Sequence, residues 1–556
     1  MKKKLLHYLT FASLFAILLI SSCKKDTLPD NINNDTVPIV SLDVSESFTW
    51  RTNEQVEFNL VFPQNLTDVL VKISSLDESV VWAKGLSEGN VYNRKIVLPT
   101  RIKNVKVSVG NNILSPINLN VSSEYVEYTF INNLKSAKIV SQLPWRYSIT
   151  GTNHSLLVPS NVVFSGVVVS PGDYIGVFYD SLGTLACGGY IEPAYNTSSN
   201  MFISAFGVDN GNDGFATGES FTWKIWQAST GNEYTATATY SSGMFTNQGN
   251  FVVNGLSGIT MLTVTSADAD NDGVPDGDDD FPNDPLRAFD NVYPGDGYGT
   301  IAFEDLWPAA GDYDFNDLVV NFQNHTIENA SNVVHEIILD VVVVANGASF
   351  HNGLGIQFPD VLPSWITSVT GYNIQENYIS HTNGLENGQS KATIIIFDDA
   401  YNVLPYPGDG FIGVNTDPNG THVNPYSVNI TISFDTSLGK TSNDIYASGN
   451  PNVFLIVNQT RGREVHLPNY QATDLADPSY FGTFDDDSNG SKTYLTVNNL
   501  PWGIETGIGF KHTTEKNSIE TAHLKFIPWV QSSGNNFEDW YMDLPNYRNV
   551  SYIYDY

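Results

Sequence analysis

The chain has 556 residues and carries 60 Asp and Glu against 27 Lys and Arg, a formal net charge of −33 at pH 7. This acid excess repels nucleic acid and anionic membranes, so we expect no nucleic-acid partner. Intrinsic disorder is also excluded, because 41% of the residues are hydrophobic and only 16% are charged. A chain of this length is expected to form about three or four domains.

The N-terminus predicts export and a lipid anchor. Residues 1–22 contain three lysines and then a mostly apolar run that is too short, and flanked wrongly, for a membrane-spanning helix. The sequence ISSC at 20–23 resembles a bacterial lipobox, in which Cys23 becomes diacylated and is the first mature residue. We therefore predict a lipoprotein signal peptide at 1–22 and an outer-membrane lipoprotein that faces either the periplasm or the medium. The alternative is an ordinary signal peptide with an unrelated cysteine.

Removal of the leader takes away three lysines and no acid, so 24 basic and 60 acidic residues would leave a net charge of −36. Cys187 would be the single remaining cysteine, which rules out an intramolecular disulfide. We expect Cys187 to be a small buried residue. An exported chain without disulfides must be stabilised by large cores or by metals.

The pattern along the chain predicts an all-β, multidomain fold. Residues 23–37 read as a polar tether, and residues 38–122 as an immunoglobulin-like β-sandwich of short alternating strands separated by turn residues. Its expected strands are SFTWRT, VEFNLVF, VLVKISSL, RKIVLP and NVKVSVG. Residues 124–263 predict a second β-sandwich, since strands rich in Tyr, Val, Ile and Phe alternate there with Gly and Asp turns.

An acidic stretch, DADNDGVPDGDDDFPNDP at 268–285, holds eight carboxylates in 18 residues. Counted from Asp268, carboxylates fall at positions 1, 3, 5, 9 and 12 and a glycine at position 6, the order that a calcium loop requires. Hard oxygen donors favour Ca²⁺ over zinc or copper. The expected ligands are Asp268, Asp270, Asp272, the carbonyl of Val274, Asp276 and Asp279. The alternative is a disordered acidic linker.

The flanks of this stretch exclude an EF-hand, because no helical pattern precedes it and Pro282 and Pro285 follow it. It resembles instead the thrombospondin type 3 repeat, which implies a calcium-stiffened spacer at 266–290. A second ion could be held there by Asp278, Asp280 and Asp284.

The segment after the spacer, 291–556, predicts a β-rich C-terminal domain. The sequence AFDNVYPGDGYGTIAFEDLWPAAGDYDFNDLVVNF at 288–322 resembles the core signature of the LruC-domain lipoproteins of Bacteroidota. Further matches are FHNGLGIQFP at 350–359, REVHLPNYQATDLAD at 463–477, FGTFDDDS at 481–488, NNLPWGIETG at 498–507 and FEDWYMDLPNYRN at 537–549. The resemblance implies an envelope lipoprotein with a calcium spacer, and implies no established activity.

The same signature predicts a second calcium site at the entry to the strand LVVNF. Asp312, Asp314 and Asn316 follow a 1-3-5 spacing, and three further acids lie close by: Glu304, Asp305 and Asp317. Turn-forming Asp and Asn side chains explain part of this pattern without a metal. A third acidic segment, FDDDS at 484–488, reads more simply as a solvated loop.

No catalytic motif emerges, since HExxH, GxSxG and P-loop patterns are absent from the sequence. We therefore expect a non-catalytic, calcium-binding envelope protein with a glycan or surface-protein ligand. The alternative is a hydrolase of an extracellular glycan or an accessory subunit of one, because acids are too numerous to exclude a glycosidase-like pair. Exposed aromatic rings could stack on sugars, with candidates Trp223, Trp226, Trp307, Trp502 and Trp540.

Overall fold

The computed structural model describes residues 37–555 except 65, 67, 111–113, 131–142, 166–168, 170–171, 194–199, 210–212, 229–231, 242–244, 246, 265–267, 348 and 490–491. Strands dominate this part of the chain and form several separate sheets, which confirms the all-β, multidomain prediction. Within these residues, no helix has the length and apolar character needed to cross a membrane. The lipidation residue Cys23 and the tether lie outside the described residues.

The first sandwich consists of two sheets with strand orders β4-β1-β7 and β3-β2-β5-β6. Alternate residues are buried on β1, β4 and β5, so one face of each sheet forms the core. The strands are β1 (Asn53–Val61), β2 (Leu70–Ser74), β3 (Val81–Leu86), β4 (Val91–Pro99), β5 (Asn104–Val109), β6 (Leu114–Asn120) and β7 (Tyr125–Thr129).

Two predicted limits of this sandwich need correction. The expected strand at 47–52 is not a strand, because Phe48 and Trp50 turn away from the sandwich and pack against Trp529 of the C-terminal domain. The expected end at residue 122 cuts off β7, which pairs in parallel with β1. Parallel pairing of distant strands has no local sequence signal, so the boundary could not be read from the pattern.

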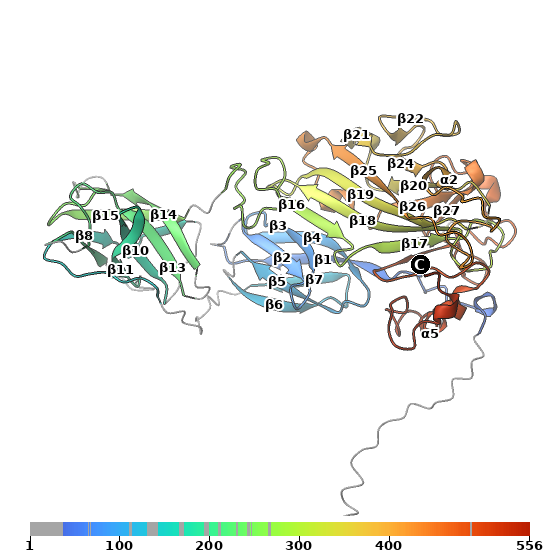
Figure 1. Ribbon diagram of the computed structural model, residues 1–556, viewed down its shortest axis with the longest axis horizontal. Coiled ribbons are helices and arrows are strands. Elements are labelled where there is room, and N and C mark those ends of the chain that lie inside the picture. The colour runs from blue at the N-terminus through green and yellow to red at the C-terminus, as the bar shows by residue number, and fades with distance from the viewer. Residues whose placement is uncertain are drawn as a thin grey trace, which may run out of the picture.

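The second unit is one eight-stranded sheet of order β11-β10-β13-β14-β15-β8-β12, with β9 paired to β15. Its two ends approach each other, since a Cβ added at Gly189 on β11 would meet the Ser204 carbonyl oxygen on β12 at 2.1 Å. No strand of this sheet pairs with a described strand elsewhere, and Figure 1 shows the unit to one side of the molecule. The strands are β8 (Asn153–Val158), β9 (Val163–Ser165), β10 (Tyr174–Ser181), β11 (Thr184–Ile191), β12 (Met201–Phe206), β13 (Thr222–Gln227), β14 (Asn232–Tyr240) and β15 (Leu256–Val264).

The C-terminal domain is built on a seven-stranded sheet of order β21-β25-β19-β18-β17-β28, with β16 on β18, which packs against a four-stranded sheet of order β24-β20-β26-β27. A two-stranded sheet joins β22 and β23. The strands are β16 (Phe289–Tyr293), β17 (Gly299–Phe303), β18 (Leu318–Glu328), β19 (Val334–Ala345), β20 (Gly353–Phe358), β21 (Ile366–Thr370), β22 (His381–Thr382), β23 (Leu385–Glu386), β24 (Ala392–Phe397), β25 (Tyr426–Phe434), β26 (Asn452–Ile456), β27 (Glu464–His466) and β28 (Gly503–Thr506).

The helices are short and lie almost entirely in the C-terminal domain. They are α2 (Ala400–Val403), α3 (Ser442–Ile445), α4 (Ile519–Ala522), α5 (Phe526–Gln531), and the 3-10 helices η1 (Ile39–Ser41), η2 (Pro363–Trp365), η3 (Thr436–Leu438), η4 (Val457–Gln459), η5 (Pro478–Tyr480) and η6 (Val550–Tyr552). Helix α5 covers the second face of the seven-stranded sheet. Successive strand residues point to opposite faces, so Val320 packs toward the four-stranded sheet and Val319 toward α5.

The first sandwich and the C-terminal domain meet at a polar seam, where β3 and β4 lie beside β16 and β18 (Figure 1). At its centre Arg94 donates two hydrogen bonds to Glu328, at 2.7 and 3.0 Å, and both side chains are buried. Asparagine amides complete the seam. Asn291 bonds to both the N–H and the carbonyl of Lys84 (2.7 and 3.1 Å), and Asn332 does the same with Leu86 (3.0 and 2.8 Å).

Replacing Arg94 with Met is expected to lower the free energy of unfolding by about 3–5 kcal/mol, because Glu328 would be left buried without its cation. Differential scanning calorimetry measures the loss. The double variant Arg94→Met with Glu328→Leu should recover most of it, since neither charge of this buried pair is then left without its partner. A double variant as unstable as the single one would contradict this account of the ion pair.

Candidate metal sites

The acidic loop, residues 268–285, begins with a tight turn that gathers its acids. Gly273 at the sixth position has φ of +102°, a conformation that glycine adopts without strain. Carboxylate oxygens of Asp268, Asp270 and Asp272 all lie within 4.8 Å of one another. Each of the three also accepts backbone N–H bonds within the loop, for example from Gly273 to Asp268 at 3.2 Å. The turn therefore places the first three predicted ligands together.

Several oxygens in this loop are buried without a partner. One carboxylate oxygen (Oδ2) of each of Asp270, Asp272 and Asp279 has no hydrogen-bond partner within the described part of the chain. Burial raises the pKa of Asp279 to about 6, and the negative charges of Asp272 and Asp270 add to this shift. The other oxygen of Asp279 accepts from the Phe281 N–H at 2.6 Å, which leaves one oxygen to coordinate an ion.

The remaining two predicted ligands have different surroundings. Asp276 accepts a hydrogen bond from the Ala269 N–H at 2.7 Å, which closes the loop on itself. The Val274 side chain is buried and packs with Phe289 and with Leu70 and Leu86 of the first sandwich. The acidic loop is thus fixed between the first sandwich and the C-terminal domain.

The acids proposed for a second ion in this loop are engaged elsewhere. Asp280 forms an ion pair with Lys84 of β3 at 3.0 Å, and Asp284 pairs with Arg287 at 2.8 Å. The pKa of Asp284 is lowered, mainly by the hydrogen bond that it accepts from the Leu286 N–H and then by its hydrogen bond from Arg287. With Asp280 and Asp284 each neutralised by a cation, the structure does not gather them with Asp278 into an ion site.

A second cluster lies at the entry to β18. Carboxylate oxygens of Glu304, Asp312 and Asp314 lie within 4.8 Å of one another. Glu304 precedes Asp314 by 10 residues, and the chain turns back so that Glu304 accepts the Phe315 N–H at 2.7 Å. Tyr313 and Phe315, between the acids, have φ of 59° and 50° and are buried in the core beneath α5. Positive φ at non-glycine residues costs free energy, and here it directs aromatic and acidic side chains to opposite sides.

Glu304, Asp312 and Asp314 form no ion pair with any basic residue that the structure describes. Glu304 and Asp314 are buried, and the pKa of Glu304 is raised well above its usual range by burial and then by the charges of Asp314 and Asp312. Burial also raises the pKa of Asp314 to about 8, with Asp312 adding to the effect. One oxygen of Glu304 (Oε2) has no partner among the described residues. Repulsion between buried acids of this kind is relieved either by protonation, which the raised pKa values favour, or by a bound cation.

One amide oxygen, from Asn316, and one carboxylate oxygen, from Glu515, complete the cluster. The buried Asn316 donates its amide to the Thr513 carbonyl at 3.3 Å, while its oxygen (Oδ1) is buried without a partner in the described chain. Glu515 also has a buried, unpartnered oxygen (Oε2), and its pKa is raised by burial and by Asp312. The spacing 1-3-5 predicted Asn316, but Glu515 lies about 200 residues away and had no sequence signal. We refer to Glu304, Asp312, Asp314, Asn316 and Glu515 as the buried acid cluster, although Asp312 is exposed at its edge and Glu515 is half-buried.

The other two predicted ligands, Asp305 and Asp317, form a neighbouring pair. The Asp305 N–H donates to Asp317 at 2.9 Å, and the Asn352 amide donates to Asp305 at 2.8 Å. Burial raises the pKa of both carboxyls, and the charge of Asp305 adds to the shift at Asp317. The pair is therefore placed beside the buried acid cluster, with hydrogen bonds of its own.

The FDDDS segment is a mostly exposed loop, as predicted, except at Asp486. Asp486 is buried and accepts hydrogen bonds from Trp307 at 3.1 Å and Ser488 at 2.7 Å. A further expectation needs correction. The five tryptophans proposed to stack on sugars are buried to 2% exposure or less. They fill the cores and present no ring to a ligand. These residues are Trp223, Trp226, Trp307, Trp502 and Trp540.

Comparison with known proteins gives a family match for part of the chain. The family described as a domain of unknown function (DUF4842) matches residues 332–541, which include Glu515 and exclude the acidic loop. A search of curated proteins finds no match. Among solved structures, a candidate lipoprotein from Bacteroides ovatus is similar at 16% identity and a TM-score of 0.39, over 60% of this chain and 90% of that one. The Bacillus anthracis TIE protein follows at 10% identity and a TM-score of 0.14, over 38% and 34% of the two chains.

Replacing Glu304 with Gln tests whether the buried acid cluster binds calcium. The difference in stability between this variant and the wild type should change sign when calcium is added. In chelator the variant should be more stable than the wild type by about 1–2 kcal/mol, because a buried ionisable group has been removed. In millimolar calcium the order should reverse, since an amide is a weaker ligand than a carboxylate. Thermal unfolding in both buffers measures the two differences.

The matched control is Glu46→Gln at an exposed position, which should change stability in neither buffer. A Glu304→Gln variant that gains the same stability from calcium as the wild type would show that Glu304 is not a ligand.

Proposed function

We propose that this protein is a calcium-stabilised, lipid-anchored protein of the cell envelope that acts by binding and not by catalysis. The observation that supports this most directly is that buried carboxylate oxygens lack a hydrogen-bond partner at two places in the described chain. The acids that carry these oxygens include Asp270, Asp272, Asp279 and Glu304, and none of these four forms an ion pair with a described residue. When they are ionised, acids in that state repel one another unless a cation lies between them. The donors at both places are oxygens alone, which favours a hard divalent ion.

Calcium suits these sites better than magnesium. The acidic loop follows a 1-3-5-9-12 spacing with a glycine at position six, and calcium accepts such irregular sets of six to eight oxygens. Magnesium demands a near-ideal octahedron and keeps several of its waters. An exported chain also meets calcium at high concentration, and the proposed sites take the stabilising role that disulfides have in many exported proteins.

The proposed ion in the acidic loop would act at a junction. The loop follows β15 of the second unit, contacts β3 of the first sandwich through the Lys84–Asp280 ion pair, and leads into β16 of the C-terminal domain. A cation bound by Asp268, Asp270 and Asp272 would fix this turn. This is the role that a thrombospondin type 3-like spacer would have.

The location rests on the N-terminal sequence. Three lysines, an apolar run and ISSC ending at Cys23 support processing as a lipoprotein, and the C-terminal motifs support the LruC type of Bacteroidota lipoprotein. We infer attachment to the outer membrane through Cys23. The acids of the two clusters accept backbone N–H bonds and are directed at each other, which favours ion binding over a glycosidase-like pair.

Calcium removal tests the main proposal. A site with Kd of ~10⁻⁵ M in about 1 mM calcium adds roughly 2.7 kcal/mol, so chelation should lower the melting temperature and expose a protease site between residues 266 and 290. The double variant Asp270→Asn with Asp272→Asn should show that protease site even in calcium. Calorimetric titration should find one ion fewer in this variant, because the buried acid cluster still binds.

The control for this experiment is the exposed pair Asp43→Asn with Glu46→Gln, which removes the same charge elsewhere. The proposal fails if the wild type binds no calcium, or if the loop variant binds as many ions as the wild type.

The anchor is tested separately. Because acyl chains are attached through the thiol, Cys23→Ala should leave the protein unprocessed or released from the membrane. Labelling cells with a palmitate analogue measures this, and Cys187→Ala serves as the control that keeps the label. Label incorporation into Cys23→Ala would refute the lipoprotein assignment.

A further inference from the structure

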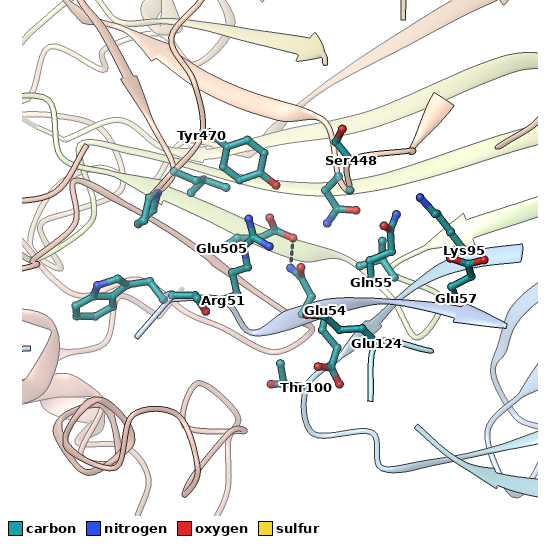
Figure 2. A pocket seen from close by; sticks show the side chains of 18 residues that line it. Arg51, Glu54, Gln55, Glu57, Lys95, Thr100, Glu124, Ser448, Tyr470 and Glu505 are labelled. Atoms are coloured by element: carbon teal, nitrogen blue, oxygen red, sulfur yellow. Dashed lines mark hydrogen bonds between the residues drawn. The ribbon is translucent and has the colours of Figure 1, made fainter. Parts of the chain in front are cut away.

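A cleft lies between the first sandwich and the C-terminal domain, next to the polar seam. It has a volume of about 450 Å³, within the range of small-ligand sites. One wall comes from β1 and β4, and the other from residues 448–450 and 467–470 with Glu505 of β28. Figure 2 shows Arg51, Glu505 and Tyr470 grouped at one end of the cleft, and Lys95 and Glu57 at the other.

Arg51 lines this cleft and is the first candidate for a ligand-binding group. Its side chain is exposed, and its guanidinium lies 5.8 Å from the centre of the Tyr470 ring. Every other buried or seam arginine named above has a carboxylate partner, but Arg51 has no hydrogen bond or ion pair within the described chain. A guanidinium held over an aromatic ring with all its donors free is oriented to bind a ligand.

Glu505 supplies the complementary acceptor. One of its oxygens (Oε1) accepts from the Asn53 amide at 2.7 Å and from the Tyr293 hydroxyl at 3.0 Å, so the carboxyl group is fixed in place. Burial raises the pKa of Glu505 to about 7, an effect that its hydrogen bond with Tyr293 and the charge of Arg51 oppose. The cleft therefore presents a fixed acceptor beside a free donor.

The walls around these groups are preorganised. The Gln55 amide donates to the Tyr446 carbonyl at 2.7 Å, and the Lys95 ammonium donates to the Ala447 carbonyl at 2.7 Å. Both bonds cross from the first sandwich to the C-terminal domain, so the two walls are held at a set separation. A ligand bound here would lose little free energy to rearrangement of the protein.

We propose that this cleft binds a neutral oligosaccharide, with Arg51 and Glu505 bonding to adjacent sugar hydroxyls. Each hydroxyl both donates and accepts, so a guanidinium beside a carboxyl group satisfies both roles. Four glutamates line the cleft against Arg51 and Lys95, which disfavours uronic acids and phosphates. This inference rests on the binding function proposed above and names its ligand class.

Calorimetric titration of the full mature chain in calcium tests the proposal. The probes are tetrasaccharides of glucose, mannose, galactose and xylose, with tetragalacturonate and tetralysine as anionic and cationic alternatives. At least one neutral tetrasaccharide should bind, and Arg51→Gln and Glu505→Gln should each weaken it by about tenfold or more, since each removes a charge-assisted hydrogen bond. Arg146→Gln, at an exposed position on the second unit, is the matched control and should bind as the wild type does.

The outcomes separate this proposal from the calcium sites. Binding by tetragalacturonate or tetralysine alone, no binding by any probe, or neutral-sugar binding that survives both cleft variants would each overturn it. Shortened sugars found by chromatography after incubation would overturn the non-catalytic function. Sugar binding that persists in a chain shown to bind no calcium would sustain the cleft and refute the calcium proposal.

Discussion

The structure depends on where its few cations are placed among an excess of acids. Three buried carboxylates are matched to arginines: Glu328 to Arg94 in the seam, and Glu386 and Glu464 to Arg461 in the C-terminal domain. Asp270, Asp272 and Asp279 of the acidic loop, and Glu304 and Asp314 of the buried acid cluster, form no ion pair with a described residue. With only 27 Lys and Arg for 60 acids, the protein's own cations cannot neutralise every cluster, so the remaining carboxyls must take up a proton or a cation from solution.

The polar seam explains why the first sandwich and the C-terminal domain act as one body. Asparagine amides bond to the backbone of β3, and Arg94 fills the space behind them. Strand β3 lies at the edge of its sheet, so some of its backbone N–H and carbonyl groups have no neighbouring strand to pair with. The side-chain amides of Asn291 and Asn332 both donate to and accept from these groups, and so take the place of that strand. The same seam fixes the walls of the cleft. Residues before β1 strengthen the union, because Trp50 donates to the Asn499 carbonyl at 2.8 Å and packs beside Trp529.

Local patterns in the sequence predicted the strands and most of the acidic groups, because period-two burial and ligand spacing are properties of a short segment. Gly273 and the 1-3-5 acids are examples. The sequence did not predict Glu515, the parallel partner of β1 or the seam asparagines, since each acts through contacts with distant parts of the chain. The tryptophans were misread for a related reason: aromatic residues serve cores and binding faces alike, and burial alone distinguishes the two.

The position of the buried acid cluster gives it a structural consequence. Asp312 and Asp314 stand at the entry to β18, and Glu515 belongs to the C-terminal segment that leads into α4 and α5. Those helices cover the seven-stranded sheet together with residues 39–50 from the start of the chain. A cation shared by Asp314 and Glu515 would therefore join the central sheet to the layer that covers it, whereas an ion in the acidic loop would act at the junction between domains. The two proposed sites differ in this respect: one holds a layer of the core in place, and the other fixes where the domains meet.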